Sequence, residues 1–194
     1  MEKITFKDLV ETPWKNGQGT TRQIAIHPKN ADISNFQWRI SAATVNTVGP
    51  FSNFDNVTRS LALLTGEKIT LSIQGHTVEL HRDGQPVTFS GTVPTEMTDC
   101  PTPALDFGVM TNNNFAKHSL VHADFNDGQT YQRKSSTTLI LALKPCQLDK
   151  NSLDTFDAIL LSETDPNCVT IQTQTRTAPL LIAEISEYCP AEPQ

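Results

Sequence analysis

Apolar and polar residues alternate over short stretches of this chain, a pattern typical of β-strands with one buried face. Residues 36–45 (FQWRISAATV) show it clearly, because their apolar and polar side chains fall on opposite faces. The first face holds Phe36, Trp38 and Ile40, and the second holds Gln37, Arg39 and Ser41. Residues 59–91 predict four more strands, separated by tight turns that contain glycine.

The second half of the chain continues in the same style. Four apolar or alternating runs predict strands at 137–143, 156–162, 168–175 and 178–186, with prolines between them. Residues 90–118 are rich in proline, threonine and asparagine, so we expect them to cross between two halves. Helix signals are weak, and short helices are expected only near 5–11 and 147–155.

Many short strands with few helices predict an all-β sandwich or barrel of antiparallel strands. A chain of 194 residues can bury its core as one large domain or as two small ones. No sequence repeat is visible, yet the two sets of strands favour two related β-modules packed together. We expect the first module to span residues 1–110 and the second to span residues 111–194.

Composition restricts the partners of this protein. The formal net charge is −6 and no basic run occurs, which argues against nucleic acid as a partner. An anionic ligand would therefore need a local pocket of positive charge. No apolar run reaches the ~20 residues of a membrane helix, and the first residues lack a leader pattern. We therefore expect a cytoplasmic protein without a membrane partner, whose four cysteines are thiols.

One stretch, TPWKNGQGTTRQIAIHP at 12–28, concentrates glycines, cations and hydroxyls. Gly17 and Gly19 permit backbone conformations with positive φ or a close approach to a ligand. Lys15 and Arg22 only donate hydrogen bonds, so a carboxylate or phosphate suits them. The simpler alternative is a glycine-rich turn with solvated charges before a strand, on which Arg22 and its neighbour would point to opposite faces. The stretch completes neither a dinucleotide fingerprint nor a P-loop.

Three arginines, at 22, 39 and 59, lie inside or at the start of separate predicted strands. An arginine that faces a barrel interior is costly unless it is paired. Each of them could form a salt bridge with Asp55, Glu67 or Asp106. The presence of three such arginines favours a polar pocket that they share.

Several segments resemble the HutD/Ves family of bicupins: PWKNGQGTTRQI, WRISAATV, GPFSNFDNVTRSLALLTGE and FSGTVP. The resemblance implies two cupin β-barrels in one chain. Two departures stand out. Gln18 replaces a third glycine of the family motif, and DFGVMTNN, from Asp106 to Asn113, replaces a motif of the form D-[LF]-N-[VL]-M-x-R-R.

The resemblance also implies a function. Family members are associated with bacterial histidine-utilisation operons or with cold and stress response. They are thought to bind a small carboxylate such as formate or an N-formylated glutamate, and to limit flux through histidine degradation. The motif carries over to Trp38, Gly49 and Pro50 as well as to the site residues given below.

Neither metal nor nucleophilic chemistry has a clear basis in the sequence. Many cupins hold a metal through an H-x-H-x(3,4)-E arrangement, and no H-x-H occurs among His27, His76, His81, His118 and His122. His118 and His122 would align on a helix, but no third ligand is in register. No G-x-S-x-G motif is present. We therefore expect no cofactor and no metal.

The leading hypothesis is a metal-independent bicupin that binds a small carboxylated metabolite. The alternatives are a small-molecule enzyme of the cupin superfamily, isomerase or dioxygenase-like, and a stress-related interaction protein whose motif only stabilises the fold. Pairing of β-edges gives a mild preference for a homodimer. The expected ligand-binding residues are Trp14, Lys15, Asn16, Gly17, Gly19, Thr21, Arg22, Arg39, Ser41, Phe51 and Arg59.

Overall fold

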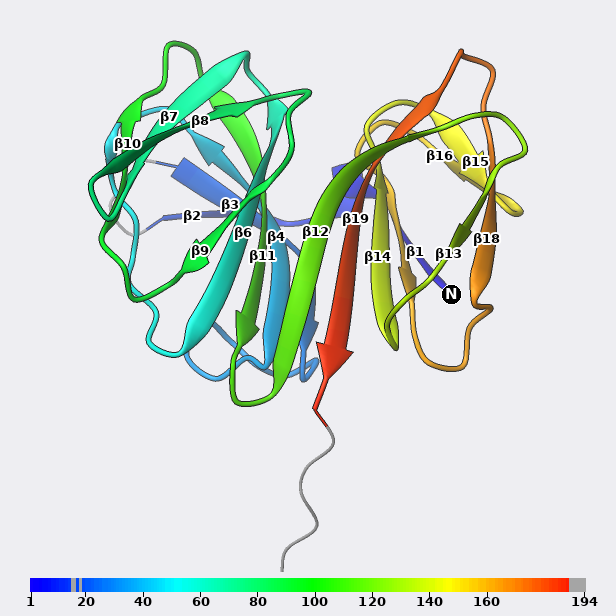
Figure 1. Ribbon diagram of the computed structural model, residues 1–194, viewed down its shortest axis with the longest axis horizontal. Helices are drawn as coiled ribbons and strands as arrows, with labels where there is room; N and C mark the ends of the chain where they lie inside the picture. Colours follow the sequence, from blue (N-terminus) through cyan, green and yellow to red (C-terminus); the bar gives the residue numbers. More distant parts are fainter. Residues whose placement is uncertain (15–16, 18, 189–194) are drawn as a thin grey trace, which may run out of the picture. The chain divides into compact units, whose positions relative to one another are not determined.

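The computed structural model describes residues 1–14, 17 and 19–188 (Figure 1). These residues form β-sheets, and the one helical element among them is a 3-10 turn, η1, at Phe6–Asp8. The chain divides into two units. We call Val10–Lys117, together with Tyr188, the N-terminal unit. His118–Glu187, together with Met1–Leu9, is the C-terminal unit.

Two antiparallel sheets make up the N-terminal unit. The larger has six strands in the order β2-β3-β4-β11-β6-β9, and the smaller has four in the order β5-β10-β7-β8. The six-stranded sheet contains β2 (Glu11–Pro13), β3 (Gly19–His27), β4 (Trp38–Val45), β6 (Val57–Thr65), β9 (Val87–Ser90) and β11 (Ala104–Asn112). The four-stranded sheet contains β5 (Gly49–Pro50), β7 (Lys68–Ile73), β8 (His76–His81) and β10 (Thr95–Asp99).

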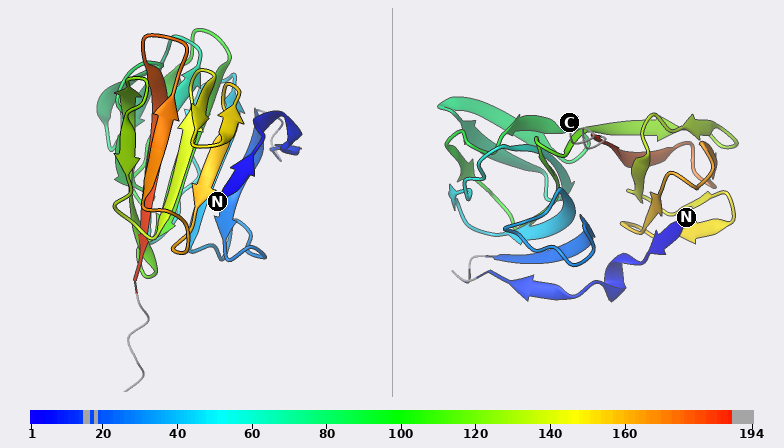
Figure 2. Two further views of the ribbon diagram at one scale, coloured as in Figure 1. Left: turned by 90° about the vertical axis from the view of Figure 1, so that its right-hand side faces the viewer. Right: turned by 90° about the horizontal axis from the view of Figure 1, so that it is seen from below.

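The C-terminal unit also has two sheets, in the orders β1-β17-β14-β19-β12 and β13-β18-β15-β16. The first contains β1 (Glu2–Ile4), β12 (Ala116–Phe125), β14 (Thr137–Ala142), β17 (Ala158–Leu161) and β19 (Ala178–Glu187). The second contains β13 (Thr130–Gln132), β15 (Cys146–Leu148), β16 (Asn151–Leu153) and β18 (Cys168–Gln172). In both units the strands curve around an interior (Figure 2).

Apolar side chains hold the two sheets of each unit together. In the N-terminal unit, Leu61 and Leu63 from the larger sheet join a buried cluster with Leu71 and Met97 from the smaller one. In the C-terminal unit, Ile140 and Ile182 join Val169 and Ile171 in the same way. Among the described residues, the strand pairing does not join the two sheets of either unit into a closed barrel. The all-β prediction is therefore confirmed, and each unit is a pair of facing sheets.

The strands expected at 36–45, within 59–91 and in the second half are present, and three expectations differ from the structure. Residues 90–118 contain β10, β11 and the start of β12 instead of a crossing segment. The helix expected near 147–155 is the β15–β16 hairpin. The expected boundary at residue 110 falls inside β11, and the N-terminal β1 pairs with β17 of the C-terminal unit.

We expect Leu71→Ala to lower the free energy of unfolding by ~2–5 kcal/mol, because it removes a fully buried side chain from between the two sheets. Val48→Ala is the matched control, since Val48 is 55% exposed. Chemical denaturation of both variants measures the difference. An equal effect of the two substitutions would contradict this account of the core.

Candidate functional site

Polar side chains cross the inner face of the six-stranded sheet at the point where β4, β11 and β6 run side by side. Cross-strand partners point to the same face of a sheet. Met110 pairs with Arg39 on one side and with Arg59 on the other. Two residues further along β11, Gly108 pairs with Ser41. The sheet register therefore brings two arginines and a serine from β4 and β6 onto one face, on either side of β11.

Arg59 is held among aromatic rings. Its guanidinium carbon lies 5.1 Å from the ring centre of Phe51, 5.6 Å from that of Phe54 and 5.4 Å from that of Phe89. One terminal nitrogen donates a hydrogen bond of 3.1 Å to the Ser52 carbonyl oxygen. Within the described part of the chain, Arg59 Nε is buried and has no hydrogen-bond partner. Burial lowers the pKa of Arg59 to about 10, so the group stays cationic at neutral pH.

Arg39 lies on the other side of Met110 from Arg59. It is half-buried, and its Nε donates a hydrogen bond of 3.3 Å to Oε1 of the exposed Gln23 on β3. Burial lowers the pKa of Arg39 as well. The charge of Arg39 also contributes to the lowered pKa of Arg59, because two cations on one face of the sheet repel each other. An anion between them would relieve this repulsion.

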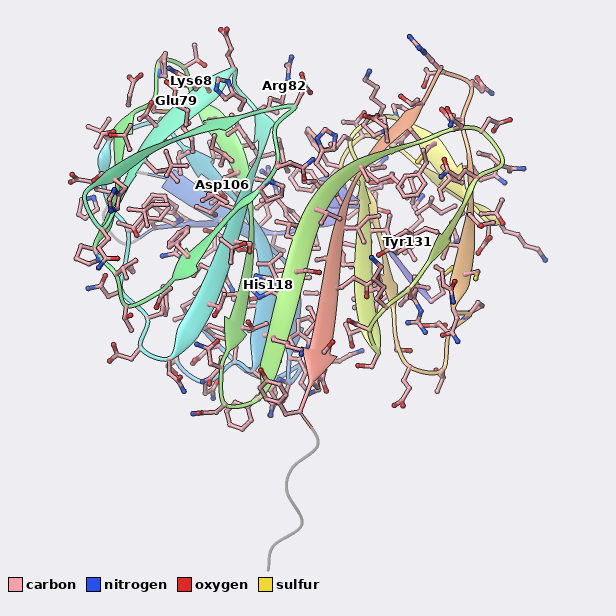
Figure 3. The ribbon with its side chains drawn as sticks, in the orientation of Figure 1. Lys68, Glu79, Arg82, Asp106, His118 and Tyr131 are labelled. Carbon is pink, nitrogen blue, oxygen red and sulfur yellow. The ribbon has the colours of Figure 1, made fainter. Side chains whose placement is uncertain are left out.

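Asp106 is the acidic residue of the same face. It lies on β11 between Ala43 and Leu63, and only 6% of its surface is exposed (Figure 3). Burial raises the pKa of Asp106 to about 7, although the charge of Arg59 and a hydrogen bond from the Ala43 backbone act in the opposite direction. Its proton can therefore be gained or lost near neutral pH.

Trp14, Gly17 and Gly19, the described residues between β2 and the start of β3, lie beside the same face. Gly17 has φ +69°, and its N–H donates to the Trp14 carbonyl oxygen over 3.0 Å. The Trp14 indole N–H donates a bond of 2.7 Å to Thr21 Oγ1, which lies across from Ala43. A Cβ on Gly19 would lie 2.5 Å from the Thr44 carbonyl oxygen and 3.0 Å from the Trp14 ring. Gly19 therefore allows Trp14 to pack against the apolar cluster between the two sheets.

Arg22 does not join the other two arginines. It pairs with Ala42, whereas Thr21 and Gln23 pair with Ala43 and Ser41, so Arg22 lies on the opposite face of β3. Its guanidinium donates a hydrogen bond of 2.8 Å to Glu11 Oε2. The expected convergence of three arginines is corrected to two, because neighbouring strand residues point to opposite faces.

The structure thus brings Arg39, Ser41 and Arg59 together, with Phe51 against Arg59 and with Trp14 and Thr21 at the β3 side. Gly17 and Gly19 shape the turn, while Lys15 and Asn16 lie outside the described residues. The prediction omitted Asp106, Gln23, Phe54 and Phe89. The sequence named Asp106 as a salt-bridge partner and as the start of a family motif, but its place in a strand pairing with both arginine strands was not apparent.

A hollow of about 440 Å³ lies elsewhere on the N-terminal unit. It is lined by Phe51, Ser72 and Glu96 among others, and by neither Arg39 nor Arg59. Ser72 alternates with the buried Leu71 along β7, so the hollow lies on the outer side of the smaller sheet. Its lining includes no cation, and it shares Phe51 with the site described above.

The interior of the C-terminal unit holds a different polar cluster. Glu184 accepts hydrogen bonds from the Tyr131 hydroxyl (2.6 Å), the Lys134 backbone (3.1 Å) and the Thr138 hydroxyl (2.9 Å). Burial and the bond to Glu184 raise the pKa of Tyr131, which is seen inside this unit in Figure 3. Both oxygens of this carboxylate are occupied, so we assign the cluster a structural role.

His118 and His122 lie on strand β12 and not on a helix, so their Cα atoms are ~13 Å apart at the usual strand rise. Burial lowers the pKa of His118 to about 4. Over the described ranges, no group of three or more His, Cys, Asp or Glu side chains could hold a metal ion. No helix in these ranges is long and apolar enough to cross a membrane.

Comparison with solved structures places this fold among the cupin-like proteins. A cupin 2 conserved barrel domain protein from Leptotrichia buccalis matches with a TM-score of 0.62 at 9% identity, over 95% of this chain and 96% of that one. HutD from Pseudomonas fluorescens SBW25, solved in a formate condition, matches with a TM-score of 0.84 at 20% identity, over 97% and 99% of the two chains.

The sequence model of the HutD family matches residues 6–179, and the chain therefore belongs to the HutD family. Protein Ves from Cronobacter sakazakii is 36% identical over 129 residues, which are 64% of this chain and 67% of that protein. Protein Ves from Escherichia fergusonii is 31% identical over 126 residues, or 64% of each chain. The alignments thus span about two thirds of these relatives. The resemblance seen in the sequence is confirmed at the level of the family.

We expect Gly19→Ala to lower the free energy of unfolding by ~1–3 kcal/mol, because the added methyl group overlaps the Thr44 carbonyl oxygen. Gly108→Ala is the matched control in the same sheet, where an added Cβ meets no atom closer than 3.5 Å. It should leave stability unchanged or raise it by ~0.5–1 kcal/mol. Thermal and urea unfolding test both, and a tolerated Gly19→Ala would contradict the role of the turn.

Proposed function

We propose that the N-terminal unit binds a small carboxylated metabolite between Arg39 and Arg59. The observation that carries this proposal is the pair of like charges on one face, of which Arg59 has a buried Nε without a hydrogen-bond partner among the described residues. A carboxylate matches two guanidinium groups in charge and in geometry. Ser41 adds a hydroxyl beside them, and Gln23 lies at the solvent side.

The binding affinity expected of such a site suits a sensor of metabolite concentration. Charge-assisted hydrogen bonds contribute ~1.5–3 kcal/mol each. Two or three of them correspond to affinities in the micromolar-to-millimolar range. An affinity in that range lets occupancy follow the concentration of a metabolite, as a regulator of pathway flux requires.

Membership of the HutD family supports a role in histidine utilisation. We propose that the chain acts as a regulator of that pathway, and that formate or N-formylglutamate is the kind of ligand it binds. The formate condition of the related HutD structure is consistent with a small carboxylate. The cupin-like neighbours support the further proposal that the two units are a pair of cupin modules, which is a bicupin arrangement.

The decisive substitution is Arg39→Gln, because Arg39 is half-buried and the variant should fold. Saturating formate or N-formylglutamate should raise the melting temperature of the wild-type protein. Arg39→Gln should lose most of this shift and bind at least tenfold more weakly by calorimetry, since ~1.5–3 kcal/mol of charge-assisted bonding is lost. Arg59→Lys should do the same, because lysine lacks the planar group that stacks among the rings.

Arg22→Gln is the matched control, because Arg22 lies on the opposite face of β3 and bonds to Glu11. It should keep the ligand-induced shift. Wild-type affinity in both site variants, or an equal loss in the control, would refute the proposed site.

A further inference from the structure

Asp106 lies on the same face as the candidate site, without a role in the function proposed above. It lies on β11, the strand that pairs with both β4 and β6, and it faces the same interior as Arg39 and Arg59. The ribbon in Figure 3 shows it inside the unit, whereas Lys68 and Glu79 lie at the rim. A carboxylate placed beside an anion site would repel the anion unless it were neutral.

The face between Asp106 and the arginine row has room for an added atom. Gly108 is the residue between Asp106 and Met110 on this face, and it has no side chain. An added Cβ there would fit without a clash, because its nearest neighbours would be Leu61 Cδ2 at 3.5 Å and the Ser41 oxygens at 3.9 and 4.0 Å. A small ligand that bound above Gly108 would lie between the arginine row and Asp106 on this face.

The charged groups that face Asp106 are few among the described residues. β4 contributes Arg39 and β6 contributes Arg59. β3 contributes the uncharged Thr21 and Gln23, and Leu63 beside Asp106 packs against apolar residues of the smaller sheet. Cys100, which follows β10 and packs against the same cluster, is a neutral thiol whose pKa burial raises.

Resting on the proposed function, we infer that the site binds its carboxylate together with one proton, and that Asp106 carries this proton. In the empty site, the Asp106 carboxylate balances one of the two guanidinium charges. When an anion binds, one proton moves from solvent to Asp106, one O–H bond forms, and the charge of that side chain changes from −1 to 0. The new hydroxyl then donates a hydrogen bond to the ligand.

Electrostatics gives the direction of this coupling. A buried carboxyl whose pKa is about 7 in the empty protein is partly ionised at neutral pH. A second negative charge nearby raises that pKa further, so the bound state holds more protons than the free state. Affinity must therefore rise as the pH falls. The ligand best suited to the site carries one carboxylate for the arginines and an uncharged acceptor, such as a formyl or amide oxygen, for Asp106.

Calorimetric titration with formate and with N-formylglutamate, from about pH 6 to about pH 8.5, tests the inference, because the carboxylates of both probes remain ionised there. Affinity of the wild-type protein should fall by up to tenfold per pH unit above neutrality. Repeating the titration in two buffers of different ionisation enthalpy should show uptake of up to one proton. N-formylglutamate should show the steeper dependence, because its formyl oxygen can accept from Asp106.

Asp106→Asn is the informative variant, because asparagine mimics the protonated side chain. It should bind with an affinity that no longer depends on pH and that matches wild-type protein at low pH. Asp55→Asn, at an exposed position before β6, is the control and should retain the wild-type dependence.

The outcomes separate this inference from the function on which it rests. No binding of either probe at any pH would refute the proposed function itself. Binding without proton uptake, or an Asp106→Asn variant with the wild-type pH dependence, would overturn only the inference about Asp106. The proton count of the wild-type protein decides the question even if the variant does not fold.

Discussion

The arrangement of the N-terminal unit depends on a guanidinium group kept inside a largely apolar interior. Arg59 cannot lose its charge at neutral pH, so its surroundings must replace water. Three phenylalanine rings and the Ser52 carbonyl oxygen do so, and Asp106 supplies an opposite charge. The rings come from the loop before β6 and from β9, so both segments are tied to the position of one cation. The aromatic side chains of these two segments are therefore explained by the need to surround the Arg59 guanidinium.

The strand register determines which side chains lie beside Arg59 on the inner face. The pairing of β11 with β4 and β6 places Arg39, Met110 and Arg59 in one row, and a slip of one residue would turn every member of a strand to the other face. Arg22 shows the effect of such an offset within β3. Its neighbours Thr21 and Gln23 face the site, whereas Arg22 bonds to Glu11 at the sheet edge. A bulge between Gln23 and Ala25 changes the alternation beyond that point.

Much of the fold follows from the alternation of apolar and polar residues, and the exceptions have a physical cause. Strand β4 was predicted because one of its faces is partly open to solvent. Strand β11 was missed because eight of its nine residues are buried, so its sequence shows no alternation. The arginines could be found as cations inside predicted strands. Asp106 could not be placed with them, since the strand that positions it was itself taken for a crossing segment.

Two of the buried carboxylates, Asp106 and Glu184, show how similar architecture supports different chemistry. Glu184 in the C-terminal unit accepts bonds from Tyr131, Lys134 and Thr138, so its charge is fully met by the fold. Asp106 is different, because burial outweighs the help of Arg59 and raises its pKa from 3.8 in the unfolded chain to about 7. Between these values the folded state binds more protons than the unfolded state, so stability falls as the pH rises through this window. A fold that keeps such a residue loses stability at neutral pH, a cost typical of groups retained to act on a ligand.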